Sequence, residues 1–179
     1  TLKVKTSAIK SFFKFLYKKD LIVSDPSYLV ATPKTEKNIP SFLLPDEIEK
    51  LIESIKPADP ISSRNLALIE LLYGSGLRIS EALNLTTNDF NRHSQTLRVV
   101  GKGKKERIVP IGNKAIEAIA KYLEFRKELA SREKPSNKLF LTKSGKPLKP
   151  AESYKIIHNL LTKYSDAPQR SPHVLRHTF

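Results

Sequence analysis

The closing stretch of the chain, SPHVLRHTF, holds a histidine and an arginine in positions suited to joint use. Ser171 and Pro172 are typical of a helix start, where a serine caps free backbone N–H groups and a proline lacks one. His173 and Arg176 follow three residues apart, so they share one face of the new helix. An imidazole transfers protons near neutral pH, and a guanidinium binds oxyanions through paired hydrogen bonds.

The spacing of the last two histidines also raises the possibility of a metal site. His173 and His177 are four residues apart, as in many zinc-binding helices. The chain has no cysteine, and no carboxylate or third histidine stands at a suitable spacing. We therefore expect no metal site, and the lack of cysteine also excludes disulfides and a cysteine nucleophile.

A second candidate cation lies in YGSGLRISEALNL, where glycines separate two apolar helices. Arg78 is expected at the start of the second helix, beside the core, and Glu81 is placed to pair with its guanidinium. The pair is either a structural ion pair or part of an anion site, and this stretch alone leaves both readings open. The segment follows a helix and lacks the third glycine of a dinucleotide-binding loop.

A third candidate is Lys102, between two glycines in VVGKGKKERIVP. Glycines allow the sharp bend of a hairpin tip and its close approach to a ligand. A lysine there could reach a DNA phosphate or donate a proton, although the hairpin taken alone favours a solvated polar turn. The spacing does not match a phosphate-binding Walker A loop.

The composition indicates a polyanionic partner. The chain has 32 Lys and Arg against 18 Asp and Glu, a net charge of +14. The surplus is concentrated in residues 1–40 (+5) and 101–150 (+9). Such blocks favour nucleic acid over a membrane, because no basic segment has an apolar face free of core packing. A merely solvated basic face would give the same count.

The apolar spacing predicts a mainly helical α+β protein with a small three-stranded antiparallel sheet. Residues 32–41 contain two prolines and almost nothing apolar, which indicates a linker. In the first helix, Phe12 and Phe13 are expected to be core residues and not base-stacking ones. Helices are expected at 9–17, 45–55, 62–76, 78–85, 113–130 and 151–165, and strands at 96–100, 106–111 and 138–142.

Three motifs, GLRISEAL, GKGKKERIVP and HVLRHTF, occur in an order and at separations that resemble the tyrosine recombinases, in particular the Xer-type and phage-integrase branch. The resemblance covers nearly the whole chain. It implies that residues 1–31 are the end of an N-terminal helical core-binding domain that clamps DNA. It also implies that residues 42–179 are the catalytic domain, truncated at its C-terminus.

The resemblance assigns roles to the candidate residues. Arg78 and Arg176 would hold the non-bridging oxygens of a DNA phosphate, and Glu81 would support Arg78. Lys102 would protonate the departing 5′-oxygen and His173 would assist. A tyrosine would form a 3′-phosphotyrosyl link, with no metal or other cofactor. The implied partners are double-stranded DNA and other recombinase protomers, as a tetramer on paired sites, in the cytoplasm.

The nucleophilic tyrosine of the family follows the His-x-x-Arg motif, whereas all six tyrosines of this chain precede it. The chain is therefore expected to be a fragment of a site-specific recombinase that binds DNA but does not cut it alone. One alternative is a non-catalytic DNA-binding regulator on the same scaffold, which would not need all four site residues. Another is a generic basic helical interaction protein, for which the three motifs would be coincidence.

Overall fold

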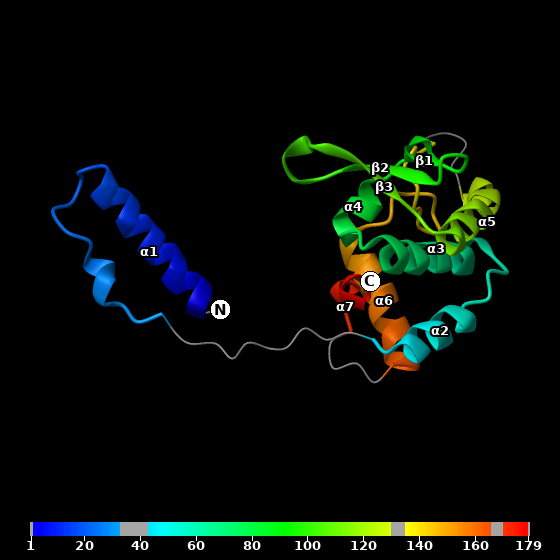
Figure 1. Ribbon diagram of the computed structural model, residues 1–179, viewed down its shortest axis with the longest axis horizontal. Coiled ribbons are helices and arrows are strands. Elements are labelled where there is room, and N and C mark those ends of the chain that lie inside the picture. Colours follow the sequence, from blue (N-terminus) through cyan, green and yellow to red (C-terminus); the bar gives the residue numbers. More distant parts are fainter. Residues whose placement is uncertain (1, 33–42, 130–134, 166–169, 179) are drawn as a thin grey trace. The chain divides into compact units, whose positions relative to one another are not determined.

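The computed structural model describes residues 2–32, 43–129, 135–165 and 170–178, with the backbone alone described for Lys102, His177 and Thr178 (Figure 1). It forms two compact units, Thr1–Ile39 and Pro40–Phe179. Most of the predicted linker, 32–41, lies outside the described residues. Within the described segments, no helix is long and apolar enough to cross a membrane.

The smaller unit consists of helix α1 (Leu2–Lys18) and the 3₁₀ turn η1 (Pro26–Leu29). Asp25 caps the turn, because its Oδ1 accepts a hydrogen bond from the Ser27 backbone N–H at 2.9 Å. The core prediction for Phe12 is wrong, since its side chain is 57% exposed. The reason is that α1 contacts only η1 within this unit, which is too small to cover its apolar residues.

The larger unit is mainly helical, as predicted, with one small sheet. Its helices and 3₁₀ turns are α2 (Pro45–Ser54), α3 (Pro60–Ser75), α4 (Ile79–Asn84), η2 (Thr87–Asp89), η3 (Lys102–Lys104), α5 (Asn113–Leu129), α6 (Pro150–Tyr164) and α7 (Pro172–Thr178).

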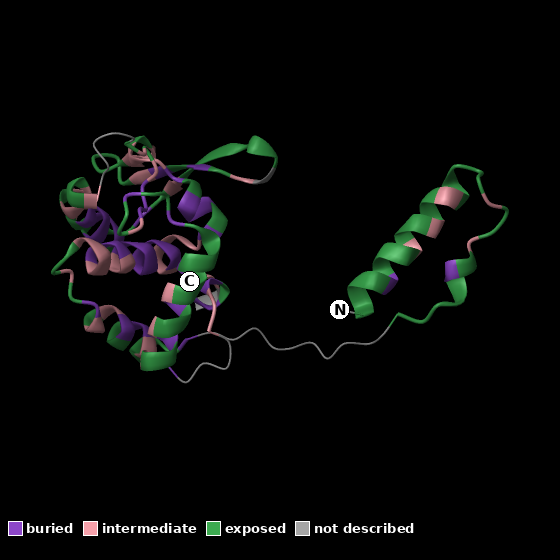
Figure 2. Cartoon of the chain, turned by 180° about the vertical axis from the view of Figure 1, so that it is seen from behind, coloured by how far each residue is buried: buried purple, intermediate pink, exposed green. Residues whose placement is uncertain are grey.

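Helix α3 forms the centre of this unit, and it is buried along most of its length (Figure 2). It is apolar on most sides, as expected for a helix surrounded by others, and α5, α7, α4 and α2 all pack against it. Gly76 ends α3 in the left-handed conformation (φ 56°), which glycine adopts without a steric penalty. The chain then turns directly into α4, so the glycine cap determines where Arg78 begins that helix.

The sheet has the order β1-β2-β3 and is antiparallel throughout, with β1 (Phe90–Asn91), β2 (Thr96–Val100) and β3 (Glu106–Pro110). The predicted strand at 138–142 is wrong, because that segment forms only isolated bridges, Thr86 to Lys138 and Leu141 to Pro147. Its apolar residues are buried by the surrounding core instead of by a ladder: Leu139, Phe140 and Leu141 are at most 1% exposed. The β-forming apolar residues of this segment therefore indicate burial in the core and not membership of the sheet.

Candidate functional site

Arg78 stands at the start of α4, as its sequence position predicts. It is the N-cap of the helix, with an extended backbone (φ −69°, ψ 145°), and its carbonyl accepts the first helical hydrogen bond from Ala82. The side chain is 59% exposed, so the guanidinium is available to a ligand. The backbone of Arg78 is held in place by the start of the helix.

Glu81 holds Arg78 and is itself buried, at 5% exposure. Its Oε2 accepts the Arg78 backbone N–H at 2.9 Å, and its Oε1 accepts Arg78 Nη1 at 3.3 Å. Arg107 of β3 donates to the same carboxylate through Nη1 and Nη2, each at 3.1 Å. Burial raises the pKa of Glu81, but the hydrogen bonds from Arg107 and Arg78 outweigh it, so the pKa lies below its usual value. Glu81 is therefore a buried anion between two arginines.

The β2–β3 hairpin places Lys102 at its tip, in η3, and extends away from the body of the unit (Figure 1). The turn uses Gly103 and Lys104 with positive φ, and the Gly101 N–H donates to the Lys105 carbonyl at 2.8 Å. The side chain of Lys102 lies outside the described residues. Its backbone position is at the end of a hairpin whose strand β2 contacts α4.

His173 is exposed on α7, and its ring contacts a tyrosine hydroxyl. Its Nε2 lies 3.3 Å from the hydroxyl of Tyr154 on α6. Tyr154 is 37% exposed, so the pair faces solvent and is open to a ligand. The predicted companion His177 is described only by its backbone.

Arg176 differs from Arg78 and Arg107 in having a buried donor without a partner among the described residues. The residue is half-buried, and its Nη1 is buried without a hydrogen-bond partner among the described residues. Unpaired buried donors are rare, because each costs the free energy of its lost hydration. An oxyanion would satisfy this donor and the positive charge together.

Helices α4 and α7 have the same two neighbours. Each of them packs against α3 and against α6, although about a hundred residues of sequence separate them. Figure 1 shows both at the same end of α3. Two guanidiniums that reach one anion can together hold a tetrahedral oxyanion, and an imidazole can move a proton.

Three of the six tyrosines have surroundings that do not suit a nucleophile. The hydroxyl of Tyr122 is buried and accepts the Leu141 backbone N–H at 3.0 Å, and burial raises its pKa. Tyr73 and Tyr164 pack against the core.

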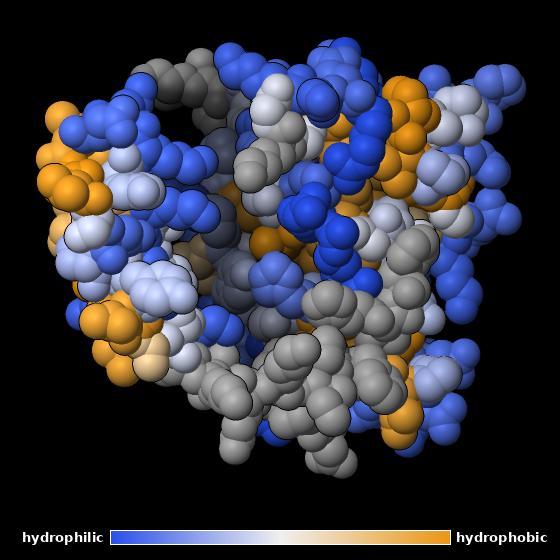
Figure 3. Space-filling view, turned by 60° about the vertical axis from the view of Figure 1, so that its left-hand side comes forward, coloured by the Kyte–Doolittle hydropathy of each residue, from blue (hydrophilic) through white to orange (hydrophobic). Residues whose placement is uncertain are grey.

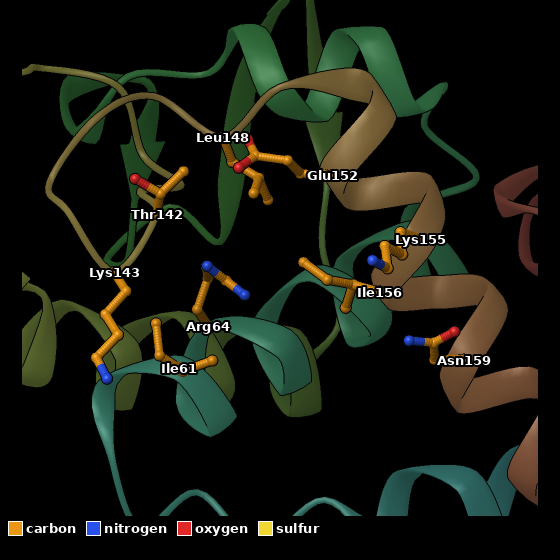
Figure 4. A pocket seen from close by; sticks show the side chains of 9 residues that line it. All are labelled: Ile61, Arg64, Thr142, Lys143, Leu148, Glu152, Lys155, Ile156 and Asn159. Atoms are coloured by element: carbon orange, nitrogen blue, oxygen red, sulfur yellow. The ribbon is translucent and has the colours of Figure 1, made fainter.

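A cavity of about 480 Å³ lies away from these residues, between the start of α3, the turn after Leu141 and α6 (Figure 4). Buried Arg64 lines it, but its guanidinium is already engaged, donating to the Leu141 carbonyl at 2.9 Å and to the Asn65 side chain. None of the candidate residues Arg78, His173 and Arg176 lines this cavity.

Two residues of the site escaped the sequence analysis. Arg107 was seen only as part of a strand, although its place five residues after Lys102 puts it at the base of the same hairpin. Tyr154 stands three and seven residues before the buried Ile157 and Leu161, so helical spacing groups it with them and does not reveal its exposure. In both cases the partner lies far away in sequence, so only the fold reveals the contact.

Comparisons with known proteins agree with the family resemblance. The model of the phage integrase family matches residues 41–179. Tyrosine recombinase XerC of Bacillus subtilis (strain 168) is 40% identical over 181 residues, covering 100% of this chain and 60% of XerC. Tyrosine recombinase XerD of Halalkalibacterium halodurans is 38% identical, covering 97% of this chain and 58% of XerD. The chain thus spans about 60% of the length of these curated relatives.

Solved structures show the same fold. The crystal structure of XerA recombinase matches with a TM-score of 0.70 and 28% identity, over 100% of this chain and 61% of XerA. XerH bound to its difH substrate in a pre-cleavage complex matches at 0.69 and 29%, over 93% of this chain and 49% of XerH. The Tn1549 transposon integrase with transposon right end DNA matches at 0.80 with 23% identity, over 97% and 63%, a likeness of fold alone.

Proposed function

Since the chain belongs to the phage integrase family, the tyrosine recombinases, we propose that it serves in site-specific DNA recombination. In this function it binds duplex DNA and holds the phosphodiester at which a strand is cut and rejoined. The smaller unit is the end of the DNA-clamping domain, and the larger unit carries the catalytic groups. Relatives of this fold have been solved with DNA substrates, which supports DNA as the ligand.

The observation that carries this proposal is the buried Nη1 of Arg176, which has no partner among the described residues. Arg78 offers a second, exposed guanidinium on a helix with the same neighbours. Negative charge grows on the non-bridging oxygens of a phosphodiester under attack. Two arginines fixed before the reaction stabilise that charge without reorganising. Glu81 keeps Arg78 in place.

The proton transfers fall to Lys102 and His173. A tyrosine hydroxyl attacks phosphorus, the P–O5′ bond breaks, and the 5′-oxygen takes a proton from Lys102 as it leaves. His173 assists by holding the phosphate or by moving the proton of the attacking hydroxyl. The bond energy is conserved in the 3′-phosphotyrosyl link, so a 5′-hydroxyl of another strand reverses the step with a new partner.

We place the nucleophile outside the six tyrosines of this chain. The hydroxyl of Tyr122 is buried against Leu141, and Tyr73 and Tyr164 pack against the core. All six tyrosines precede the His-x-x-Arg motif, whereas the nucleophile of the family follows it. The chain alone then binds and positions a phosphate without forming the covalent intermediate. Other protomers on paired sites complete the exchange.

The DNA surface is expected where the basic side chains gather. Hydrophilic side chains cover much of the face shown in Figure 3, interrupted by apolar groups. Blocks 1–40 and 101–150 hold the largest charge surplus in the sequence. Phosphate contacts by lysine and arginine release counterions from DNA, so binding weakens as salt rises.

Duplex binding by the site variants tests this function. We expect the affinity of the chain for duplex DNA to fall more than about tenfold between 50 and 200 mM salt. Arg176→Ala should weaken binding beyond the effect of Arg98→Ala, a matched loss of one charge at an arginine already paired with Asp89 at 2.9 Å. Binding that is insensitive to salt, or equal losses in the two variants, would count against the proposal.

A further inference from the structure

Arg107 contacts Glu81 through both of its terminal nitrogens. Its two terminal nitrogens donate to the two oxygens of Glu81, each at 3.1 Å, in the paired geometry of strong arginine–carboxylate contacts. Arg78 reaches the same carboxylate with one terminal nitrogen at 3.3 Å. Glu81 is thus held on one side by the Arg78 backbone N–H, at 2.9 Å, and on the other by the Arg107 guanidinium, and the Arg78 guanidinium contacts the carboxylate that these two groups fix.

The same guanidinium also lies against the base of the hairpin that carries Lys102. A Cβ atom added at Gly101 would stand 3.0 Å from Arg107 Nη1, 3.6 Å from the Lys105 carbonyl oxygen and 3.8 Å from Glu81 Oε1. A side chain at this position would require the guanidinium to move by a few tenths of an ångström. Gly101 directly precedes Lys102, so the Arg107–Glu81 pair fills the corner between the hairpin and the start of α4.

These contacts distinguish a positioning role from direct DNA binding. Arg107 is 44% exposed, but both of its terminal nitrogens are directed to a buried carboxylate. Arg78, at 59% exposure, keeps Nη2 and Nε without a partner among the described residues. Of these two arginines, Arg78 therefore has the larger part of its guanidinium uncommitted to Glu81.

We propose that Arg107 is a positioning residue, which through Glu81 fixes the Arg78 guanidinium and ties the Lys102 hairpin to the start of α4. The inference rests on the proposed function, in which Arg78 and Lys102 act on one phosphate. When the Arg107–Glu81 contact is lost, Arg78 still begins α4, but its guanidinium becomes more mobile.

The first test needs no ligand and uses the whole chain. In Arg107→Gln, the pKa of Glu81, followed by carbon NMR of its carboxyl group, should rise, since the largest stabilising hydrogen bonds of the carboxylate are removed. The ¹⁵N heteronuclear NOE of the Arg78 Nε–H should fall, reporting a more mobile guanidinium. Arg98→Gln, the same charge change on the neighbouring strand, should alter neither.

A second variant perturbs the pair while leaving Arg107 in the chain. Gly101→Ala displaces the Arg107 guanidinium by a few tenths of an ångström, so it should shift the Glu81 pKa and the Arg78 Nε–H heteronuclear NOE in the same directions as Arg107→Gln, by smaller amounts. Gly112→Ala is the matched control, because a Cβ there meets nothing within 4 Å. If neither the pKa of Glu81 nor the heteronuclear NOE of the Arg78 Nε–H changed in Arg107→Gln and in Gly101→Ala, the inference would be overturned.

The third test uses inorganic phosphate as the probe. Arg107→Gln and Arg107→Lys should both weaken phosphate binding, by roughly tenfold, and neither should cause a further loss in an Arg78→Ala background. Retained affinity in Arg107→Lys, or a loss that persists without Arg78, would mean that Arg107 binds the anion itself and would overturn the inference. If the unaltered chain bound no phosphate, the proposed function would fail, while the Glu81 and Arg78 readouts would still decide the role of Arg107.

Discussion

At the scale of single residues, the site depends on one buried carboxylate. Glu81 accepts four hydrogen bonds from two arginines and stays ionised in spite of its burial. A buried anion of this kind stabilises the fold only while it is charged. Its titration is therefore a direct report on the contacts of Arg78 and Arg107.

The pH dependence of stability should show this carboxylate. Its pKa in the folded chain lies below the ordinary 4.5, so its stabilising contribution is present above about pH 4.5 and is lost as the pH falls through the folded value. Glu81→Gln should lower the free energy of unfolding by about 1–3 kcal/mol at pH 7. The difference from the unaltered chain should shrink as the pH falls below about 4.5, measured by urea unfolding at a series of pH values.

An exposed glutamate provides the control. Glu124 contacts Lys121 only at 3.5 Å and is 70% exposed, so Glu124→Gln should leave the curve unchanged. Parallel pH curves for Glu81→Gln and the unaltered chain would show that the carboxylate does not titrate as its contacts require.

The residue types of the site could be predicted from the sequence, but their contacts could not. Arg78 and Glu81 are three residues apart on one helix, so their pairing follows from helical spacing, and it is present. The contacts of Arg107 with Glu81 and of Tyr154 with His173 join segments 26 and 19 residues apart. Such pairs depend on how β3 docks against α4 and α6 against α7, which no local pattern encodes.

At the scale of elements, the core relies on a few polar contacts that link helices to loops. The hydroxyl of Tyr122 on α5 accepts the Leu141 N–H, and its ring stacks on Phe140 with centroids 5.8 Å apart. Both groups are buried, so no water replaces the hydroxyl if it is removed.

Tyr122→Phe tests this link. The substitution keeps the ring but leaves the Leu141 N–H unsatisfied, so we expect the chain to lose about 1–3 kcal/mol of unfolding free energy. Chemical denaturation measures it, with Tyr28→Phe, at an 85% exposed tyrosine, as the control. A loss no greater than that of the control would argue against the buried contact.

The sequence predicts helix bounds well where a proline or a glycine marks the helix end. Proline opens α2, α3 and α6, and Gly76 closes α3, so their bounds lie within a few residues of the expected ones. The segment at 138–142 misled because apolar β-formers mark burial as well as strands. The core prediction for Phe12 is wrong because an amphipathic pattern reveals an apolar helix face but not which element covers it.

At the scale of the whole molecule, the phosphate-binding groups and the nucleophile are proposed to be separate. Incubated with a nicked or suicide DNA duplex, the chain alone should form no covalent adduct that survives denaturing electrophoresis. Adding a partner recombinase that can donate its tyrosine should restore one. An adduct of the isolated chain, mapped by mass spectrometry to any of its six tyrosines, would show that the nucleophile has been misplaced.

The most direct measurement is whether Arg78 and Arg176 bind the same phosphate. Titration of the chain with inorganic phosphate should shift the Nε resonances of Arg78 and Arg176 with one shared dissociation constant, while Arg98, paired with Asp89, stays unchanged. Arg78→Ala should weaken the response of Arg176 as well, because two guanidiniums share one anion. Two unrelated dissociation constants, or an Arg176 response that is unaffected by Arg78→Ala, would contradict a common site.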